Sequence, residues 1–207
     1  MDLLKPFGPA AAGSLLRASV GDRNLDVART LAEAFAGVAD VEVVHGDLLD
    51  VDADAIVSAG NSFGDMGGGI DKAIDDLHEG AAQRAIGAAI AETFLGELPV
   101  GMGLVVELPG RRFPFVVAAP TMRVPGPVMR TLNAYLAMRG ALVAVLRHNA
   151  SGRRPIRTVA VPGLGTGVGG MAFGDAARQM RAAWDGVVGG GWRRVVHPAM
   201  APFAMPF

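Results

Sequence analysis

The sequence predicts one α/β domain, a three-layer α/β/α sandwich with a central mixed, mostly parallel sheet. Two observations favour this class. Short β-branched runs alternate with helical patterns along almost the whole chain, and each of two glycine-rich stretches follows a predicted strand and precedes a predicted helix. Such alternation is typical of a sheet covered by helices on both faces. Half of the 207 residues are apolar (51%), enough for a sizeable core.

The first half of the chain predicts a strand–helix unit followed by two further strands and two helices. Asp22 or Asn24 is suited to cap the first helix, which has a regular apolar stripe. The β-branched run 41–44 predicts a strand, and Ile56 and Val57 form the centre of the next one. The predicted strands are 15–20, 41–44 and 53–59, and the predicted helices are 25–35, 69–77 and 81–94.

The second half predicts four more strands and two long helices. Pro109-Gly110 indicates a turn between two apolar strands. Pro127 has the φ angle suited to a first helical position, and apolar residues recur at helical spacing from there to Leu146. The predicted strands are 103–108, 113–118, 156–161 and 192–196, and the predicted helices are 127–146 and 173–188.

Composition excludes several classes of protein. The formal charge of −1 gives no basic excess for nucleic acid or an anionic membrane. The absence of cysteine excludes disulfide frameworks, thiol nucleophiles and cysteine-ligated metals. The four histidines show no metal-ligand spacing, so we expect neither a metal nor another cofactor.

The chain is expected to form a single domain over residues 14–197. We expect residues 1–13 to be a flexible lead-in and residues 198–207 to be a C-terminal tail. No apolar run approaches the roughly 18 residues of a membrane span. Asp2 and Arg17 argue against a signal peptide, and a reducing cytosol is compatible with the lack of cysteine, so we expect a cytoplasmic protein.

Two glycine-rich loops are the candidate sites. Gly67, Gly68 and Gly69 precede Ile70-Asp71 at a predicted helix start, where free backbone N–H groups and the helix dipole favour an anion. The second loop runs from Gly163 to Gly170, and its amides can form an anion nest. The alternatives are a surface loop for the first and a plain strand–helix connection for the second.

The second loop also matches G-x-G-x-x-G through Gly165, Gly167 and Gly170, which is a weak indication of a dinucleotide fold. It lies late in the chain, with one predicted strand left to follow it. That strand, from Trp192, offers no terminal acid for a ribose. A dinucleotide-binding oxidoreductase is therefore the less favoured reading.

Taken in order, the motifs resemble the macrodomain family and its phage- and bacteria-associated branch. The family pattern has a Gly-Asp after an early strand, a strand ending in Asn-Ala-Ala-Asn, a Gly-Gly-Gly-Val-Asp helix start and a late Ser-Thr-Gly-Ile-Phe-Gly loop. This chain has Gly46-Asp47, then a strand from Asp54 to Asn61, then Gly67 to Asp71, then Gly165 to Gly170. The resemblance covers about residues 41–196.

The resemblance implies a role for each matching residue in binding ADP-ribose. Asp47 would accept a hydrogen bond from the adenine amino group, and the Leu48 amide would donate to the ring. Asn61 would bind the distal ribose, and Asp71 would orient or activate a water that attacks the anomeric carbon. The backbones of Gly67, Gly68, Gly69, Ile70, Gly165, Thr166, Gly167, Val168 and Gly169 would surround the diphosphate and distal ribose.

Each polar residue also has a purely structural alternative. Asp47 can cap a turn, Asn61 can serve a turn, and Asp71 can stabilise the helix start. Ser58 replaces the first Asn of the family pattern, and Gly169 stands where many members have an aromatic residue. The leading hypothesis is an ADP-ribosyl hydrolase acting on protein or small-molecule substrates. The alternative is a non-catalytic ADP-ribose reader or a phage-related binding module.

Overall fold

The computed structural model describes residues 16–108 and 112–201, and its centre is a six-stranded sheet in the order β2-β1-β6-β3-β5-β4. All neighbouring strands are parallel except β4 and β5, which pair antiparallel. The strands are β1 (Arg17–Asp22), β2 (Val41–His45), β3 (Ala55–Ser58), β4 (Leu104–Glu107), β5 (Phe115–Ala118) and β6 (Thr158–Pro162). The predicted mixed, mostly parallel sheet is confirmed.

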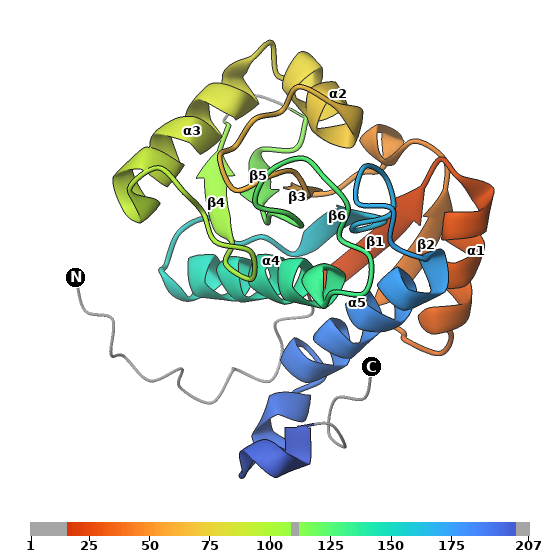
Figure 1. Ribbon diagram of the computed structural model, residues 1–207. Coiled ribbons are helices and arrows are strands. Elements are labelled where there is room, and N and C mark those ends of the chain that lie inside the picture. Colours follow the sequence, from red (N-terminus) through yellow and green to blue (C-terminus); the bar gives the residue numbers. More distant parts are fainter. Residues whose placement is uncertain (1–15, 109–111, 202–207) are drawn as a thin grey trace.

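In the described part of the chain, five α-helices cover the two faces of the sheet (Figure 1). They are α1 (Leu25–Ala34), α2 (Gly69–Leu77), α3 (Ala81–Phe94), α4 (Asn133–Ala150) and α5 (Phe173–Val187). Three short 3₁₀ segments are η1 (Leu48–Asp50), η2 (Gly191–Arg194) and η3 (Pro198–Met200). Within the described part of the chain no helix is long and apolar enough to cross a membrane.

The core lies in two clusters, one on each face of the sheet. Val57 and Val117 belong to the cluster that packs against α1, α4 and α5, whereas Ile56 and Val116 belong to the cluster under α2 and α3. Side chains of adjacent strand residues point to opposite faces of the sheet, so β3 and β5 contribute side chains to both clusters. β5 is therefore apolar at every position, and β3 is apolar at every position but its last, Ser58.

The N-terminal helix is capped as predicted. The Asn24 side chain accepts a hydrogen bond from the Asp26 N–H at 2.9 Å, and Asp22 accepts one from the Asn24 N–H at 2.8 Å. These contacts fix the turn between β1 and α1. The turn consequently holds Arg23 in a set position at the end of β1.

The predicted helix start at Pro127 is wrong, because α4 begins at Asn133. Val128 is buried, and its N–H donates to the Gly169 carbonyl at 2.8 Å. Residues 119–132 therefore serve as a long loop packed against the loop after β6. The predicted Pro109-Gly110 turn lies outside the described residues.

The predicted closing strand at 192–196 is also wrong, because Gly191–Arg194 forms a 3₁₀ turn instead. The sheet position beside β6 is already filled by β1, which pairs with β2 on one side and β6 on the other. After α5, Gly190 adopts φ +72° and reverses the chain. Trp192 is left half exposed (51%) rather than buried in a sheet.

Gly140 allows α4 to contact the chain before β4. A Cβ on Gly140 would lie 2.7 Å from the Met102 carbonyl oxygen, which is backbone and cannot move aside freely. We expect Gly140→Ala to lower the free energy of unfolding by about 2 kcal/mol. Gly87→Ala is the matched control in α3, because a Cβ there meets nothing within 4 Å. It should raise stability by about 0.5–1 kcal/mol. Equal free energies of unfolding for Gly140→Ala and Gly87→Ala, measured by urea denaturation, would contradict this close packing.

Candidate functional site

The two glycine-rich loops lie side by side at one edge of the sheet. β3 and β6 are adjacent parallel strands, with Ala55 opposite Val159 and Ile56 opposite Ala160. The loops that follow them, residues 59–68 and 163–172, therefore leave the same edge (Figure 1). The loops after β1 and β2 leave that edge too, because these strands are parallel to β6. The loop after β5 leaves the same edge, because β5 is parallel to β3. Five strand ends thus converge on one region, which is where ligands bind in open α/β sheets.

The first loop presents open backbone at the start of α2. Gly68 is the N-cap residue, and no side chain caps the first amides of the helix. A Cβ placed on Gly68 or Gly69 would meet nothing within 4 Å, so space is open in front of both residues. Uncapped N–H groups beside open space are the arrangement that binds an anion at a helix N-terminus.

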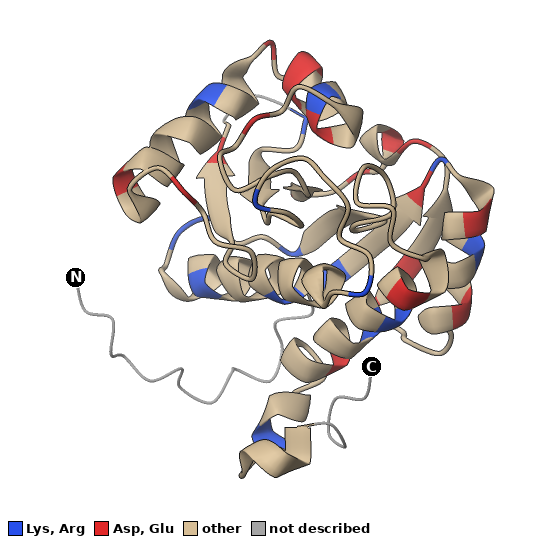
Figure 2. Cartoon of the chain, in the orientation of Figure 1, with Lys and Arg blue, Asp and Glu red and all other residues tan. Residues whose placement is uncertain are grey.

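The second loop is held by its own hydrogen bonds. The Met171 N–H donates to the Gly165 carbonyl at 3.0 Å, and the Thr166 hydroxyl donates to the Gly163 carbonyl at 2.9 Å. The loop contains no charged residue, and its ribbon is uncoloured in Figure 2. Open space again lies in front of Gly167, where a Cβ would meet nothing within 4 Å, and Val168 is 70% exposed.

Gly169 cannot carry the aromatic side chain that many family members have at this place. A Cβ there would lie 2.6 Å from both the Gly165 carbonyl oxygen and Val128 Cγ2. The close approach of the loop to Val128 therefore requires glycine. The loop leads into α5 but no strand follows α5 among the described residues, so the G-x-G-x-x-G match lacks the β-α-β unit of a dinucleotide fold.

Asp71 is a buried carboxyl in the first turn of α2. Ser58, the last residue of β3, donates its hydroxyl hydrogen to Asp71 Oδ1 at 2.7 Å. The pKa of Asp71 is raised to about 6, mainly by burial; hydrogen bonds from Ser58 and the Ala59 backbone oppose the rise, and the charge of Asp65 adds a smaller increase. A carboxyl with such a pKa can exchange a proton close to neutral pH.

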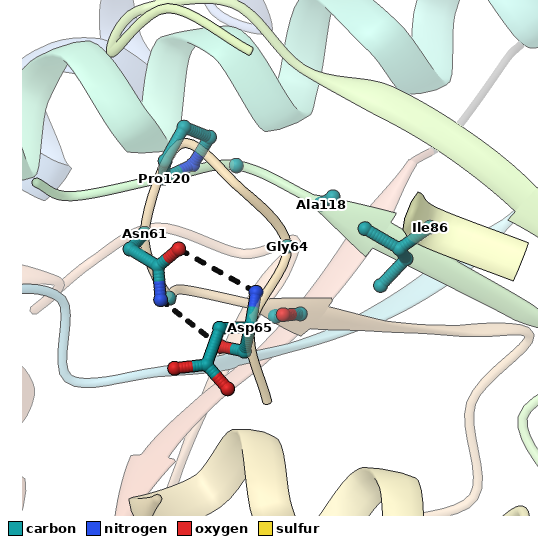
Figure 3. A pocket seen from close by; sticks show the side chains of 9 residues that line it. Asn61, Gly64, Asp65, Ile86, Ala118 and Pro120 are labelled. Carbon is teal, nitrogen blue, oxygen red and sulfur yellow. Dashed lines mark hydrogen bonds between the residues drawn. The ribbon is translucent and has the colours of Figure 1, made fainter. Parts of the chain in front are cut away.

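Asn61 organises the loop between β3 and α2. Its Nδ2 donates to the Asp65 carbonyl at 3.0 Å, and its Oδ1 accepts from the Asp65 N–H at 3.4 Å (Figure 3). Its Oδ1 also accepts from the Phe63 N–H at 3.0 Å. The turn contact that was the structural alternative for Asn61 is thus present. Asn61 also lines a small pocket behind the glycine run, together with Ser58, Gly60, Gly64, Asp65, Ile86, Ala118, Ala119 and Pro120.

Asp47 follows β2 at the same edge of the sheet. Its Oδ1 accepts from the Leu49 N–H at 3.0 Å, which caps η1, and its Oδ2 accepts from the Arg23 guanidinium. The hydrogen bond from Arg23 lowers the pKa of the Asp47 carboxyl. Leu48, the neighbouring candidate, is buried. The structure therefore brings the three predicted parts of the site, after β2, β3 and β6, to one edge of the sheet.

Two residues near the site were missed by sequence reasoning. Asp65 lines the pocket, and its Oδ1 accepts from the Gly67 N–H at 3.0 Å. The spacing of Asp65 two residues before a glycine is typical of an Asx turn and could have indicated this contact. Arg23 pairs with Asp47 across 24 positions of sequence, and no local pattern predicts such a pair. Among the described residues, no group of three or more His, Cys, Asp or Glu side chains could hold a metal.

Comparison with known proteins places these loops in a family. The model of the macro domain matches residues 57–180, from β3 to α5. An uncharacterized protein of Aeropyrum pernix is 35% identical over 156 residues, which cover 74% of this chain and 75% of that protein. The macrodomain of Mycobacterium tuberculosis DarG has 26% identity and a TM-score of 0.54, with 69% of this chain and 88% of that chain covered.

A mutant macrodomain of Oceanobacillus iheyensis with ADPR has the same fold, with a TM-score of 0.51 and 22% identity over 67% of this chain and 72% of that chain. The family predicted from four ordered motifs is thereby confirmed. The chain belongs to the macro domain family.

Proposed function

We propose that this protein binds ADP-ribose across the two glycine-rich loops and hydrolyses an ADP-ribosyl linkage on a protein or small molecule. One observation carries the proposal: the uncapped start of α2 and the loop after β6 lie beside each other with open space in front of Gly68 and Gly167. A diphosphate fits such a place because both loops offer backbone N–H donors. The Oceanobacillus iheyensis macrodomain structure with ADPR supports the choice of ligand.

The remaining parts of the ligand fit the polar groups on either side. Asp47, after β2, offers a carboxylate to the adenine amino group, and the Leu48 amide lies next to it in the chain. Asn61, in the loop after β3, lies on the other side of β6 from Asp47 in the strand order. The strand order β2-β1-β6-β3 therefore matches the order of the ligand: base, diphosphate and distal ribose.

The hydrolytic step is assigned to water held near Asp71 and Asn61. Water would add to the anomeric carbon of the distal ribose as the bond to the leaving group breaks. The attacking water would lose its proton to a carboxylate, and Asp71, whose burial raises its pKa to about 6, suits that exchange. The leaving group would depart with the electron pair of the broken bond.

A non-catalytic ADP-ribose reader is the second candidate, and the site's geometry gives a specific reason for it. Asp71 is only 9% exposed, and its carboxyl already accepts a hydrogen bond from Ser58. The Asn61 side chain is likewise engaged by the backbone of its own loop. A reader would keep the diphosphate loops and leave these polar groups in their structural contacts.

Isothermal titration with ADP-ribose tests the binding proposal. We expect saturable binding, with adenosine much weaker because it lacks the diphosphate. The absence of binding at about 1 mM ligand, corresponding to less than about 4 kcal/mol, would remove the proposal. Release of ADP-ribose from ADP-ribosylated protein then separates the two candidates. Turnover that Asp71→Asn abolishes supports the hydrolase, and binding without turnover supports the reader.

A further inference from the structure

Arg23 lies between the base end and the diphosphate end of the proposed site. It follows β1, which lies between β2 and β6 in the sheet. On the β2 side, the Gly46 N–H donates to the Asp22 carbonyl at 3.1 Å, and the Arg23 guanidinium donates to Asp47. On the β6 side, a Cβ on Gly163 would lie 2.9 Å from Asp22 Oδ2. The turn that carries Arg23 thus contacts both neighbouring loops.

Arg23 is the basic residue that lies nearest in the strand order to both Asp47 and the loop after β6; the loop after β5 leaves the same edge and adds Arg123, which pairs with Glu97, and Arg130. The segments after β1, β2, β3 and β6 are residues 22–24, 46–54, 59–68 and 163–172, all of them described, and Arg23 is the only Lys or Arg in them. Asp22 and Asp47 already place negative charge here, and a diphosphate adds one more charge for each phosphate. A cation that offsets this repulsion would therefore strengthen the binding of a dianion at this edge.

We propose that Arg23 is an affinity- and specificity-determining residue that changes partners when ADP-ribose binds. In the free protein its guanidinium pairs with Asp47. When the adenine amino group takes an Asp47 oxygen, Arg23 turns toward the diphosphate between Asp47 and the Gly163–Gly170 loop. This inference rests on the proposed function, and it gives the N-terminal strand–helix unit a role in ligand binding.

The exchange of partners is favoured by the charge and exposure of Arg23. The Arg23 side chain is 70% exposed and that of Asp47 is 27% exposed, so the pair can separate without burying either charge alone. A guanidinium has a planar fork of donors that matches phosphate oxygens, and a diphosphate carries more charge than one carboxylate. Arg23 can reach the phosphates only after the adenine amino group has displaced it from Asp47. Recognition of the base and recognition of the diphosphate are therefore coupled.

A double-mutant cycle between Arg23 and Asp47 tests the exchange by titration with ADP-ribose. We expect Arg23→Ala to raise the Kd about tenfold, the effect of losing one charge-assisted hydrogen bond. The same loss should persist in an Asp47→Asn background, where Asn still accepts from the base but no ion pair exists. Arg29→Ala is the matched control, because Arg29 is an exposed arginine of α1, the helix that follows Arg23, and its ion-pair partner is Asp26 at 3.8 Å instead of Asp47.

Salt dependence gives a second readout. Raising the salt concentration from about 0.05 M to 0.5 M should weaken ADP-ribose binding more in the parent and in Arg29→Ala than in Arg23→Ala. Salt screens the contact between Arg23 and the diphosphate, and Arg23→Ala no longer has that contact. Arg23→Lys should keep the salt dependence and part of the affinity. An Arg23→Ala effect that vanishes in the Asp47→Asn background, or no effect in the parent, would overturn the inference and leave the proposed function standing. Failure of the parent to bind ADP-ribose would refute the proposed function itself.

Discussion

Gly68→Glu will weaken ADP-ribose binding about 100-fold and leave the melting temperature of the protein unchanged. Gly68 has extended backbone (φ −151°) that any residue adopts, and a Cβ there meets nothing within 4 Å. The glutamate side chain therefore enters open space without disturbing the fold. Its carboxylate would stand at the proposed diphosphate site, and like charges about 6 Å apart near a protein surface repel by about 3 kcal/mol, which corresponds to about 100-fold in Kd.

Gly68→Gln is the matched control, because it has the same size without the charge. Titration calorimetry of the two variants separates charge repulsion from steric blocking. We expect Gly68→Gln to weaken ADP-ribose binding less than Gly68→Glu does. Gly167→Glu repeats the test on the second loop, where a Cβ also meets open space. If one of the two glutamate variants binds ADP-ribose like the parent, its loop is not part of the diphosphate site.

The strand ends and glycine loops were predictable because local chemistry determines them. Ile56 and Val57 define β3, and the successive glycines before Ile70 define the start of α2. Once the strands are taken as parallel, their carboxyl ends must share an edge, so the neighbourhood of Asp47, Asn61 and the glycine loops follows from the order of elements.

Features that depend on contacts far apart in the sequence could not be predicted. The strand expected from Trp192 has a β-branched pair, yet the sheet already has β1 at the position beside β6. The helix expected from Pro127 has the right spacing, yet Val128 is buried against the Gly169 loop. In both places tertiary packing overrides a local preference, which sequence periodicity does not register.

The site's electrostatics were hidden for the same reason. The replacement of Asn by Ser58 was visible in the sequence, but its hydroxyl contact with Asp71 depends on how α2 packs on β3. The Arg23–Asp47 pair depends on β1 lying next to β2. Sequence reasoning thus identified the loops that meet at this edge of the sheet, and the structure added which side chains set the charge and proton balance there.

The raised pKa of Asp71 predicts that the free energy of unfolding falls as pH rises. Burial raises the folded pKa of Asp71 from 3.8 to about 6. Below pH 3.8 the carboxyl is neutral in both states, and the folded state has its full advantage. As pH rises through about 6 the folded protein must ionise a buried group, and that advantage is lost. A shift of roughly two units corresponds to about 3 kcal/mol.

Asp71→Asn should remove this loss, because Asn keeps an oxygen that accepts from Ser58 but never ionises. We expect the free energies of unfolding of parent and variant to diverge between pH 4 and pH 7, with the variant more stable by about 3 kcal/mol at the upper end. Asp76→Asn is the matched control on the same helix, since its side chain is 63% exposed and paired with Lys72. Urea denaturation across this pH range gives the free energy of unfolding of all three proteins.

Parallel curves of the free energy of unfolding against pH for the parent and Asp71→Asn would mean that Asp71 is solvated in the folded protein. Such a result would also undermine the proposed part of Asp71 in proton transfer. If the curves diverge as expected, the more stable variant should also lose turnover, because the buried charge that costs stability is the group assigned to accept the proton.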